Sequence, residues 1–193
     1  MAFQPSSAVL APLAPTHRKL PLWPSTGVIY FVTLRLADAL PIHARTRLDS
    51  RQVNAADSFA WLDRHLDAGF GCAVFADPAR SLLVERTLWR SDQTRYALGP
   101  FVVMPNHVHV LVQPWGEQTI GSVVNRWKGE IARELRHCEE IGGRIWPEET
   151  IERVTRDESE LRRFNDYIFG NPKAARAAEG TYRFGRGTAD WPT

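Results

Sequence analysis

The chain has 193 residues and a mass of 21.9 kDa, with 24 basic and 22 acidic residues and therefore a formal net charge of +2. A chain of this length forms one domain, with or without extensions, and buries about 70% of its unfolded surface, so it needs no disulfide or metal merely to fold. The balanced charge excludes wholesale coating of a polyanion. No run approaches the ~18 apolar residues that span a bilayer, so we expect no contact with a membrane.

Composition divides the chain into three parts. Residues 1–26 are rich in proline and predicted to be irregular, residues 27–177 carry the regular patterns, and residues 178–193 form a basic, glycine-containing tail. Cys72 and Cys138 form no C-x-x-C pair, which is typical of isolated thiols in a reducing cytosol. The N-terminal segment has no basic leader before its apolar run, so we expect a cytoplasmic protein without a signal peptide.

The first half of the central region predicts one strand, two helices and an ambiguous segment. Residues 27–36 are β-branched and aromatic, which predicts a strand. Residues 50–67 carry an approximately helical apolar stripe. Residues 71–75 are compatible with a short strand or an extended segment. A helix then begins at Pro78, with Asp77 as its N-cap.

The second half of the central region predicts a hairpin and two helices. Residues 96–104 and 107–112 are β-rich runs separated by a proline-bearing turn, which indicates an antiparallel hairpin. Residues 118–137 and 156–170 predict helices, and Pro172 is expected to lie just beyond the end of the second. This mixed order with a central hairpin predicts an α+β protein, in which helices pack on an antiparallel sheet.

Two histidines stand two residues apart in the second strand of the predicted hairpin. His107 and His109 therefore point to the same face, while Val108 and Val110 point to the other face and into a core. Two imidazoles on one face can converge on a divalent metal. The pattern by itself more often marks two ordinary, half-exposed histidines than a site.

Tyr167 and Asn171 lie four residues apart in the last predicted helix and so share one face. A tyrosine can act as a covalent nucleophile, and an asparagine supplies an oxygen that a hard divalent cation accepts. The alternative for Tyr167 is a structural tyrosine whose ring lies in the core and whose hydroxyl reaches the surface.

The run Val102-Val103-Met104-Pro105-Asn106-His107-Val108-His109-Val110-Leu111-Val112 closely resembles the histidine-hydrophobe-histidine signature of the single-tyrosine HUH transposases. Further motifs match in order and spacing: Arg95-Tyr96, Trp127-Lys128, Trp146, Arg156-Asp157-Glu158 and Tyr167-Ile168-x-x-Asn171-Pro172-x-x-Ala175. Together they resemble the REP-associated tyrosine transposases, over residues 27–187. The resemblance implies that residues 27–177 form a ferredoxin/RRM-like HUH endonuclease domain.

The resemblance also implies a mechanism. His107, His109 and Asn171 would bind Mg²⁺ or Mn²⁺, which polarises the scissile phosphodiester. Tyr167 would attack phosphorus and leave a 5′-phosphotyrosine and a free 3′-hydroxyl. The expected substrate is single-stranded DNA beside a REP-like hairpin, and members of the family act as monomers or homodimers. The sequence names no convincing general base for Tyr167.

Basic residues concentrate around the tyrosine helix and are the candidates for contacts with DNA phosphates. They are Arg156, Arg162, Arg163, Lys173, Arg176, Arg183 and Arg186, together with Lys128 from the preceding helix. An equally open interpretation is a solvated helix face with ion pairs. Trp115, Trp127 and Trp146 could stack on unpaired bases or pack in the core.

The sequence departs from the family at two places. Residues 149–154 lack the usual aromatic residue, and the segment 182–187 replaces the commoner Trp-Ser-Ser type of ending. Both changes bear on the DNA hairpin that is recognised more than on the chemistry. Two alternative functions remain open: a domesticated DNA-binding protein of the same fold that does not cleave, and a metal hydrolase that uses the two histidines with activated water.

Overall fold

The computed structural model of the chain describes residues 27–191 apart from residues 50–57 and 138–142. One antiparallel sheet lies at the centre of the fold. The strand order is β4-β1-β3-β2-β5. The strands are β1 (Tyr30–Arg35), β2 (Tyr96–Val103), β3 (His107–Pro114), β4 (Ile151–Val154) and β5 (Arg183–Gly185). The central strand β3 pairs with β1 on one side and with β2 on the other.

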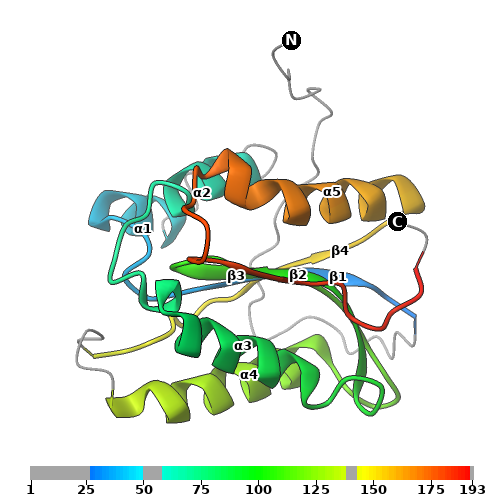
Figure 1. Cartoon of the computed structure of the whole chain (residues 1–193). Coiled ribbons are helices and arrows are strands. Elements are labelled where there is room, and N and C mark those ends of the chain that lie inside the picture. Colours follow the sequence, from blue (N-terminus) through cyan, green and yellow to red (C-terminus); the bar gives the residue numbers. More distant parts are fainter. Residues whose placement is uncertain (1–26, 50–57, 138–142, 192–193) are drawn as a thin grey trace.

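Helices cover both faces of this sheet. They are α1 (Ile42–Asp49), α2 (Ser58–Leu66), α3 (Pro78–Trp89), α4 (Ile120–Glu134) and α5 (Glu158–Ala174), with short 3-10 turns η1 (Val74–Ala76) and η2 (Leu135–His137). Helices α3 and α4 lie on one face, and α2 and α5 lie on the other (Figure 1). The predicted α+β class, with helices packed on an antiparallel sheet, is confirmed.

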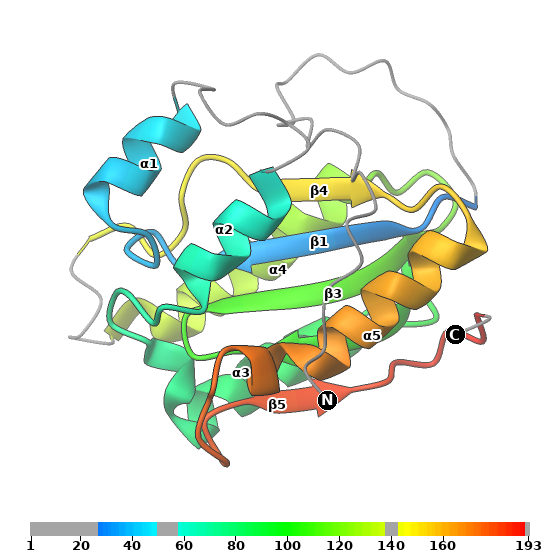
Figure 2. The same ribbon diagram turned by 90° about the horizontal axis from the view of Figure 1, so that it is seen from above.

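Side chains alternate between two cores along β3. Val108, Val110 and Val112 belong to the large core under α3 and α4. Leu111 belongs to the smaller core under α5, which also contains Phe164 and Ile168. His107 and His109 therefore face α5, which crosses above the strands in Figure 2. This alternation follows from the two-residue period of a strand.

Several predicted elements are confirmed. Strand β1 and the β2–β3 hairpin lie where the sequence indicates them. Helix α3 begins at Pro78, and Asp77 caps it by accepting hydrogen bonds from the backbone N–H groups of Ala79 and Arg80. The helix predicted over 50–67 is described from Ser58 onwards, and its first part lies outside the described residues.

Other elements differ from prediction. Residues 74–76 form a 3-10 turn and not a strand, because Ala73 has a left-handed backbone (φ 46°) that interrupts any extended path. Helix α1 and strands β4 and β5 were not predicted. The two strands are four and three residues long, too short to show a period of their own.

Pro172 lies inside α5 and not beyond its end, so that prediction was wrong. A proline removes one helical hydrogen bond and its ring crowds the preceding turn. Here the ring is buried, and the helix continues only to Ala174. The backbone N–H of Ala175 donates to the Asn171 carbonyl and that of Ala177 to the Pro172 carbonyl, which closes the last turn.

The segment expected to form a tail contributes β5 to the sheet. Gly185 lies opposite Phe101 of β2, and a Cβ atom there would stand 2.1 Å from the Phe101 ring. Glycine at this position lets the segment approach β2. The N-terminal segment 1–26, which the sequence predicts to be irregular, and Cys138 lie outside the described residues. In the part of the chain that the structure describes, no helix is long and apolar enough to cross a membrane.

Candidate active site

The fold brings together the four residues that the sequence singled out for catalysis and metal binding. His107 and His109 come from β3, and Tyr167 and Asn171 come from α5 above it. The Tyr167 hydroxyl lies 3.3 Å from His109 Nε2. Asn171 Nδ2 donates a hydrogen bond of 3.0 Å to the same hydroxyl. The phenol oxygen is therefore held between the strand and the last turn of the helix.

A chain of hydrogen bonds orients His107. Asn106 Nδ2 donates to the backbone carbonyls of Leu66 and Phe70, at 3.1 and 3.0 Å, which fixes the direction of the amide. Asn106 Oδ1 then faces His107 Nδ1 at 2.7 Å. An amide oxygen only accepts, so Nδ1 must carry the proton. His107 Nε2 consequently keeps its lone pair, and this atom has no hydrogen-bond partner.

Two residues of the neighbouring strand β1, Thr33 and Phe31, fix the position of the His109 ring. Thr33 Oγ1 lies 3.0 Å from its Nδ1, because Thr33 stands opposite His109 in the β1–β3 register. The Phe31 ring stacks on the imidazole at a centroid distance of 5.3 Å. The rings of His107 and His109 lie 4.6 Å apart. Both imidazoles thus have fixed orientations before any ligand arrives.

The structure adds two carboxyl groups that the sequence did not single out. Asp63 and Asp67 stand four residues apart near the end of α2, on one face of the chain. The Tyr167 hydroxyl is hydrogen bonded to the Asp63 carboxyl group, and Asp67 is hydrogen bonded to Asn171. Asp63 Oδ1 lies 3.8 Å from His109 Nε2. The signal available in the sequence was their helical spacing.

Burial dominates the electrostatics of the site. It lowers the pKa of His107 to about 3 and that of His109 well below its ordinary value. Both imidazoles are therefore neutral near pH 7, which is the form that binds metals. Burial raises the pKa of Tyr167 well above its ordinary value, and the nearby Asp63 charge raises it further. Burial likewise raises the pKa of Asp63, and it raises that of Asp67 to about 6.

The donor set fits a divalent cation. Four buried polar atoms around Tyr167 have no hydrogen-bond partner: His107 Nε2, Asn171 Oδ1, Asp63 Oδ1 and Asp67 Oδ1. Unpaired buried acceptors are costly, and a bound cation would satisfy those among them that ligate it. Among the described residues, no three His, Cys, Asp or Glu side chains are already arranged around a single point, so the amide oxygen of Asn171 or a small side-chain rotation is needed to complete a set.

The predicted DNA-contacting residues fall into two groups. Six are exposed: Arg156, Arg162, Arg163, Lys173 and Arg176 lie on α5 or within two residues of its ends, and Arg186 follows β5. Arg183 differs, because its Nε donates a 2.7 Å hydrogen bond to Glu85 of α3. Lys128 is half-buried, donates to Thr150 Oγ1 and lies on α4, across the sheet from Tyr167.

The tryptophans separate into core and surface. Trp127 is 1% exposed and its Nε1 donates to the Tyr96 hydroxyl at 2.9 Å. Trp146 is also buried and donates to the backbone carbonyl of Lys128. Trp115 is exposed. Of the three, only Trp115 is exposed, whereas Trp127 and Trp146 pack in the core.

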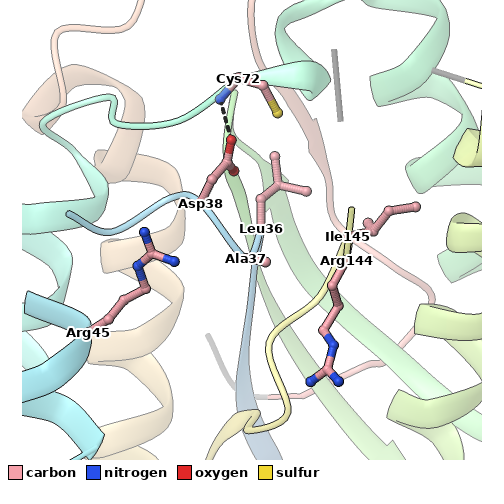
Figure 3. A pocket seen from close by; sticks show the side chains of 7 residues that line it. All are labelled: Leu36, Ala37, Asp38, Arg45, Cys72, Arg144 and Ile145. Carbon is pink, nitrogen blue, oxygen red and sulfur yellow. Dashed lines mark hydrogen bonds between the residues drawn. The ribbon is translucent and has the colours of Figure 1, made fainter. Parts of the chain in front are cut away.

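A separate pocket of about 240 Å³ lies beyond the end of β1 (Figure 3). Arg45 of α1 and Arg144 stand on opposite sides of it, and Asp38 lies between them. The Asp38 carboxylate accepts a 2.7 Å hydrogen bond from the backbone N–H of Cys72. None of the residues that line this pocket belongs to the cluster around Tyr167.

Comparison with known proteins gives two similarities. The chain is 30% identical over 94 residues to an uncharacterized protein of Haemophilus influenzae; the match covers 37% of this chain and 52% of the relative, so the chain spans about half of that relative's length. It is also similar to a solved structure of a REP-associated tyrosine transposase bound to a REP hairpin, with a TM-score of 0.49 and 16% identity over 82% of this chain and 74% of the other. No family model matches the chain.

Proposed function

We propose that this protein is a metal-dependent enzyme that cleaves and rejoins single-stranded DNA beside hairpins, with Tyr167 as the nucleophile. The observation that carries the proposal is the position of the Tyr167 hydroxyl. It lies 3.3 Å from His109 Nε2, and its hydrogen-bond partners Asp63 and Asn171 each carry a buried Oδ1 without a partner. A tyrosine with only a structural role would not require unpaired buried acceptors beside its hydroxyl. The motif resemblance supplies the class of substrate.

In the proposed reaction, the Tyr167 oxygen attacks phosphorus in line with the bond to the 3′ oxygen. The new bond is a phosphotyrosine on the 5′ side, and the P–O3′ bond breaks. The phenol loses its proton to water, and the departing 3′ oxygen gains one from water. A second strand's 3′-hydroxyl can reverse these steps, because the covalent bond conserves the energy needed for rejoining.

His107, His109 and Asn171 would hold Mg²⁺ or Mn²⁺, which when bound would polarise the phosphodiester and orient it for attack. The chain's own residues do the positioning. Asn171 Nδ2 holds the phenol oxygen at 3.0 Å, while its Oδ1 is left free to face the cation. The Asn106 amide holds His107 with its Nε2 lone pair directed into the site.

The six exposed basic residues on and beside α5 would contact the DNA backbone. Five of them lie on α5 or within two residues of its ends, and Arg186 lies over the ring of Phe169 in α5. Such contacts position a strand without reading its sequence. The cation-π contact between Arg186 and Phe169, at 5.0 Å from the ring centroid, gives this surface an aromatic element as well. Single strands are bound by this combination of charge and rings.

The test incubates the protein with end-labelled single-stranded DNA that carries REP-like hairpins with unpaired flanks, in the presence of Mn²⁺. We expect a covalent protein–DNA adduct that survives denaturation and disappears in Tyr167→Phe. Tyr182→Phe is the matched control and retains the adduct, because Tyr182 lies outside α5 and its ring pairs with that of Phe184.

Two results would overturn the proposal in different ways. Tight DNA binding without an adduct on any hairpin would indicate a non-cleaving DNA-binding protein. Cleavage that persists in Tyr167→Phe would indicate a metal hydrolase in which water, and not the phenol, attacks. Adducts and cleavage products are read from a denaturing gel, and DNA binding is read from a native gel.

A further inference from the structure

We infer that Asp63 of α2 is a carboxylate ligand of the same metal, which gives the site an anionic donor that the two histidines and one amide do not provide. This inference rests on the proposed metal site. It adds a residue from a third element of the fold to the strand and the helix that carry the other ligands.

Asp63 occupies the position that a ligand requires. Asp63 is buried, with 7% of the residue exposed. Its Oδ1 lies 3.8 Å from His109 Nε2. Two donors at right angles on a cation with bonds of about 2.1 Å lie about 3 Å apart. The observed distance exceeds this separation by less than about 1 Å. The Asp63 Oδ1 atom is buried and has no hydrogen-bond partner.

The surroundings explain why a cation belongs beside Asp63. A carboxylate oxygen only accepts, and its neighbours in the site present lone pairs as well: His107 Nε2 and Asn171 Oδ1 are also unpaired. A buried group of acceptors without donors is unfavourable. A divalent cation converts this repulsive arrangement into a coordinated one, and hard oxygen ligands are those that Mg²⁺ and Mn²⁺ prefer.

Asp67, the first residue after α2, has a different role. It is half-buried, and its carboxyl group is hydrogen bonded to Asn171. Asp67 therefore acts through Asn171 and is a positioning residue. Loss of the Asp63 carboxylate should therefore weaken metal binding more than loss of the Asp67 carboxylate. The first change removes a bond to the metal, whereas the second only loosens the position of the Asn171 amide.

The experiment measures Mn²⁺ binding to the full chain without DNA, from the loss of the six-line electron paramagnetic resonance signal of free Mn²⁺. We expect Asp63→Asn to weaken binding at least about tenfold, because even residues that merely orient metal ligands contribute 10–100-fold. Asp166→Asn is the control. Asp166 is an exposed acidic residue beside Tyr167 in α5, so this variant removes one negative charge without removing a ligand, and binding stays within about threefold of wild type.

A second variant separates ligation from structure. Asp63→Cys replaces a hard ligand by a soft thiolate, so the ratio of Cd²⁺ affinity to Mn²⁺ affinity should rise at least about tenfold relative to wild type. A carboxylate that only packed against Tyr167 would leave this ratio unchanged. Thermal unfolding of each variant verifies that it is folded, and Asp63→Cys carries the test if Asp63→Asn does not fold.

The outcomes distinguish this inference from the function on which it rests. Wild-type protein that binds no Mn²⁺ would overturn the metal site as a whole. Wild-type binding that is unchanged in Asp63→Asn would overturn only the role of Asp63 and leave His107, His109 and Asn171 in place. A loss in Asp67→Asn that equals or exceeds the loss in Asp63→Asn would overturn the choice of Asp63 as the ligand.

Discussion

Asn106 Oδ1 lies 2.7 Å from His107 Nδ1, and the same amide donates to the carbonyls of Leu66 and Phe70. One side chain thus ties the end of α2 to the hairpin and fixes the tautomer of a candidate metal ligand. A buried amide that makes all three bonds leaves the imidazole only one orientation for its lone pair.

Asn106→Ala should therefore lower both metal affinity and stability. Losing the partner of Nδ1 is expected to weaken Mn²⁺ binding about 10–100-fold, and two unpaired carbonyls should cost roughly 1–3 kcal/mol of unfolding free energy. Asn106→Asp is the matched control, since it keeps the acceptor for His107 but loses both donated bonds. Its buried carboxylate also faces the two carbonyls, so it should be at least as destabilised as Asn106→Ala in urea unfolding and still bind Mn²⁺ more tightly. Equal Mn²⁺ affinities in the two variants would show that the tautomer is set elsewhere.

The buried pair of Arg153 and Glu160 joins β4 to the first turn of α5. Arg153 is 6% exposed and Glu160 is 2% exposed, and Arg153 also lies over the Phe164 ring. Removing one partner of such a pair leaves an uncompensated buried charge, so Glu160→Gln should cost about 3–5 kcal/mol. The double variant Arg153→Met/Glu160→Leu should be more stable than either Arg153→Met or Glu160→Leu alone. A double-mutant cycle in urea checks this, and purely additive losses would contradict it.

Gly185 permits β5 to join the sheet. Because a Cβ atom would meet the Phe101 ring at 2.1 Å, Gly185→Val should displace β5 from β2 and lower the melting temperature. Hydrogen exchange should become faster at the β2 amides that face β5. Gly129→Ala is the control: an added Cβ meets nothing within 4 Å in the middle of α4, so this change should stabilise the protein by about 0.5–1 kcal/mol. Undisturbed exchange in Gly185→Val would mean that β5 adds little to the sheet.

The lowered pKa of Lys128 predicts that the free energy of unfolding depends on pH. Burial lowers the pKa of Lys128 to about 8, whereas an unfolded lysine has a pKa of about 10.4. The folded state therefore disfavours the charged form. The resulting penalty is complete below pH 8 and disappears as the pH rises from about 8 to 10.4, because only the unfolded state is then still protonated.

Wild-type protein should accordingly gain stability relative to Lys128→Met between pH 7 and pH 9.5, by about 1 kcal/mol after allowance for solvent screening. Urea unfolding of both proteins at the two pH values measures the difference, in which the titration of all other groups cancels. A difference that stays constant, or that moves in favour of Lys128→Met, would contradict the lowered pKa.

The sequence alone determined the hairpin, the side on which its histidines lie, and the pairing of Tyr167 with Asn171. These features depend on periods of two and four residues, which are local properties of a strand and a helix. The same local reasoning misplaced Pro172, since the packing that retains a proline within the last turn of α5 comes from outside that helix.

Tertiary structure alone decided the roles of Asp63, Asp67 and β5. Two acidic residues four apart in a helix ordinarily indicate a solvated face, and only the docking of α2 against α5 buries them beside Tyr167. Strand β5 exists only where β2 offers it an edge, because three residues have no stable extended structure of their own. Local periodicity thus specifies which side chains share one face of a strand or helix. Contacts between segments that are distant in the sequence determine which of these faces pack together and which charged side chains are buried away from water.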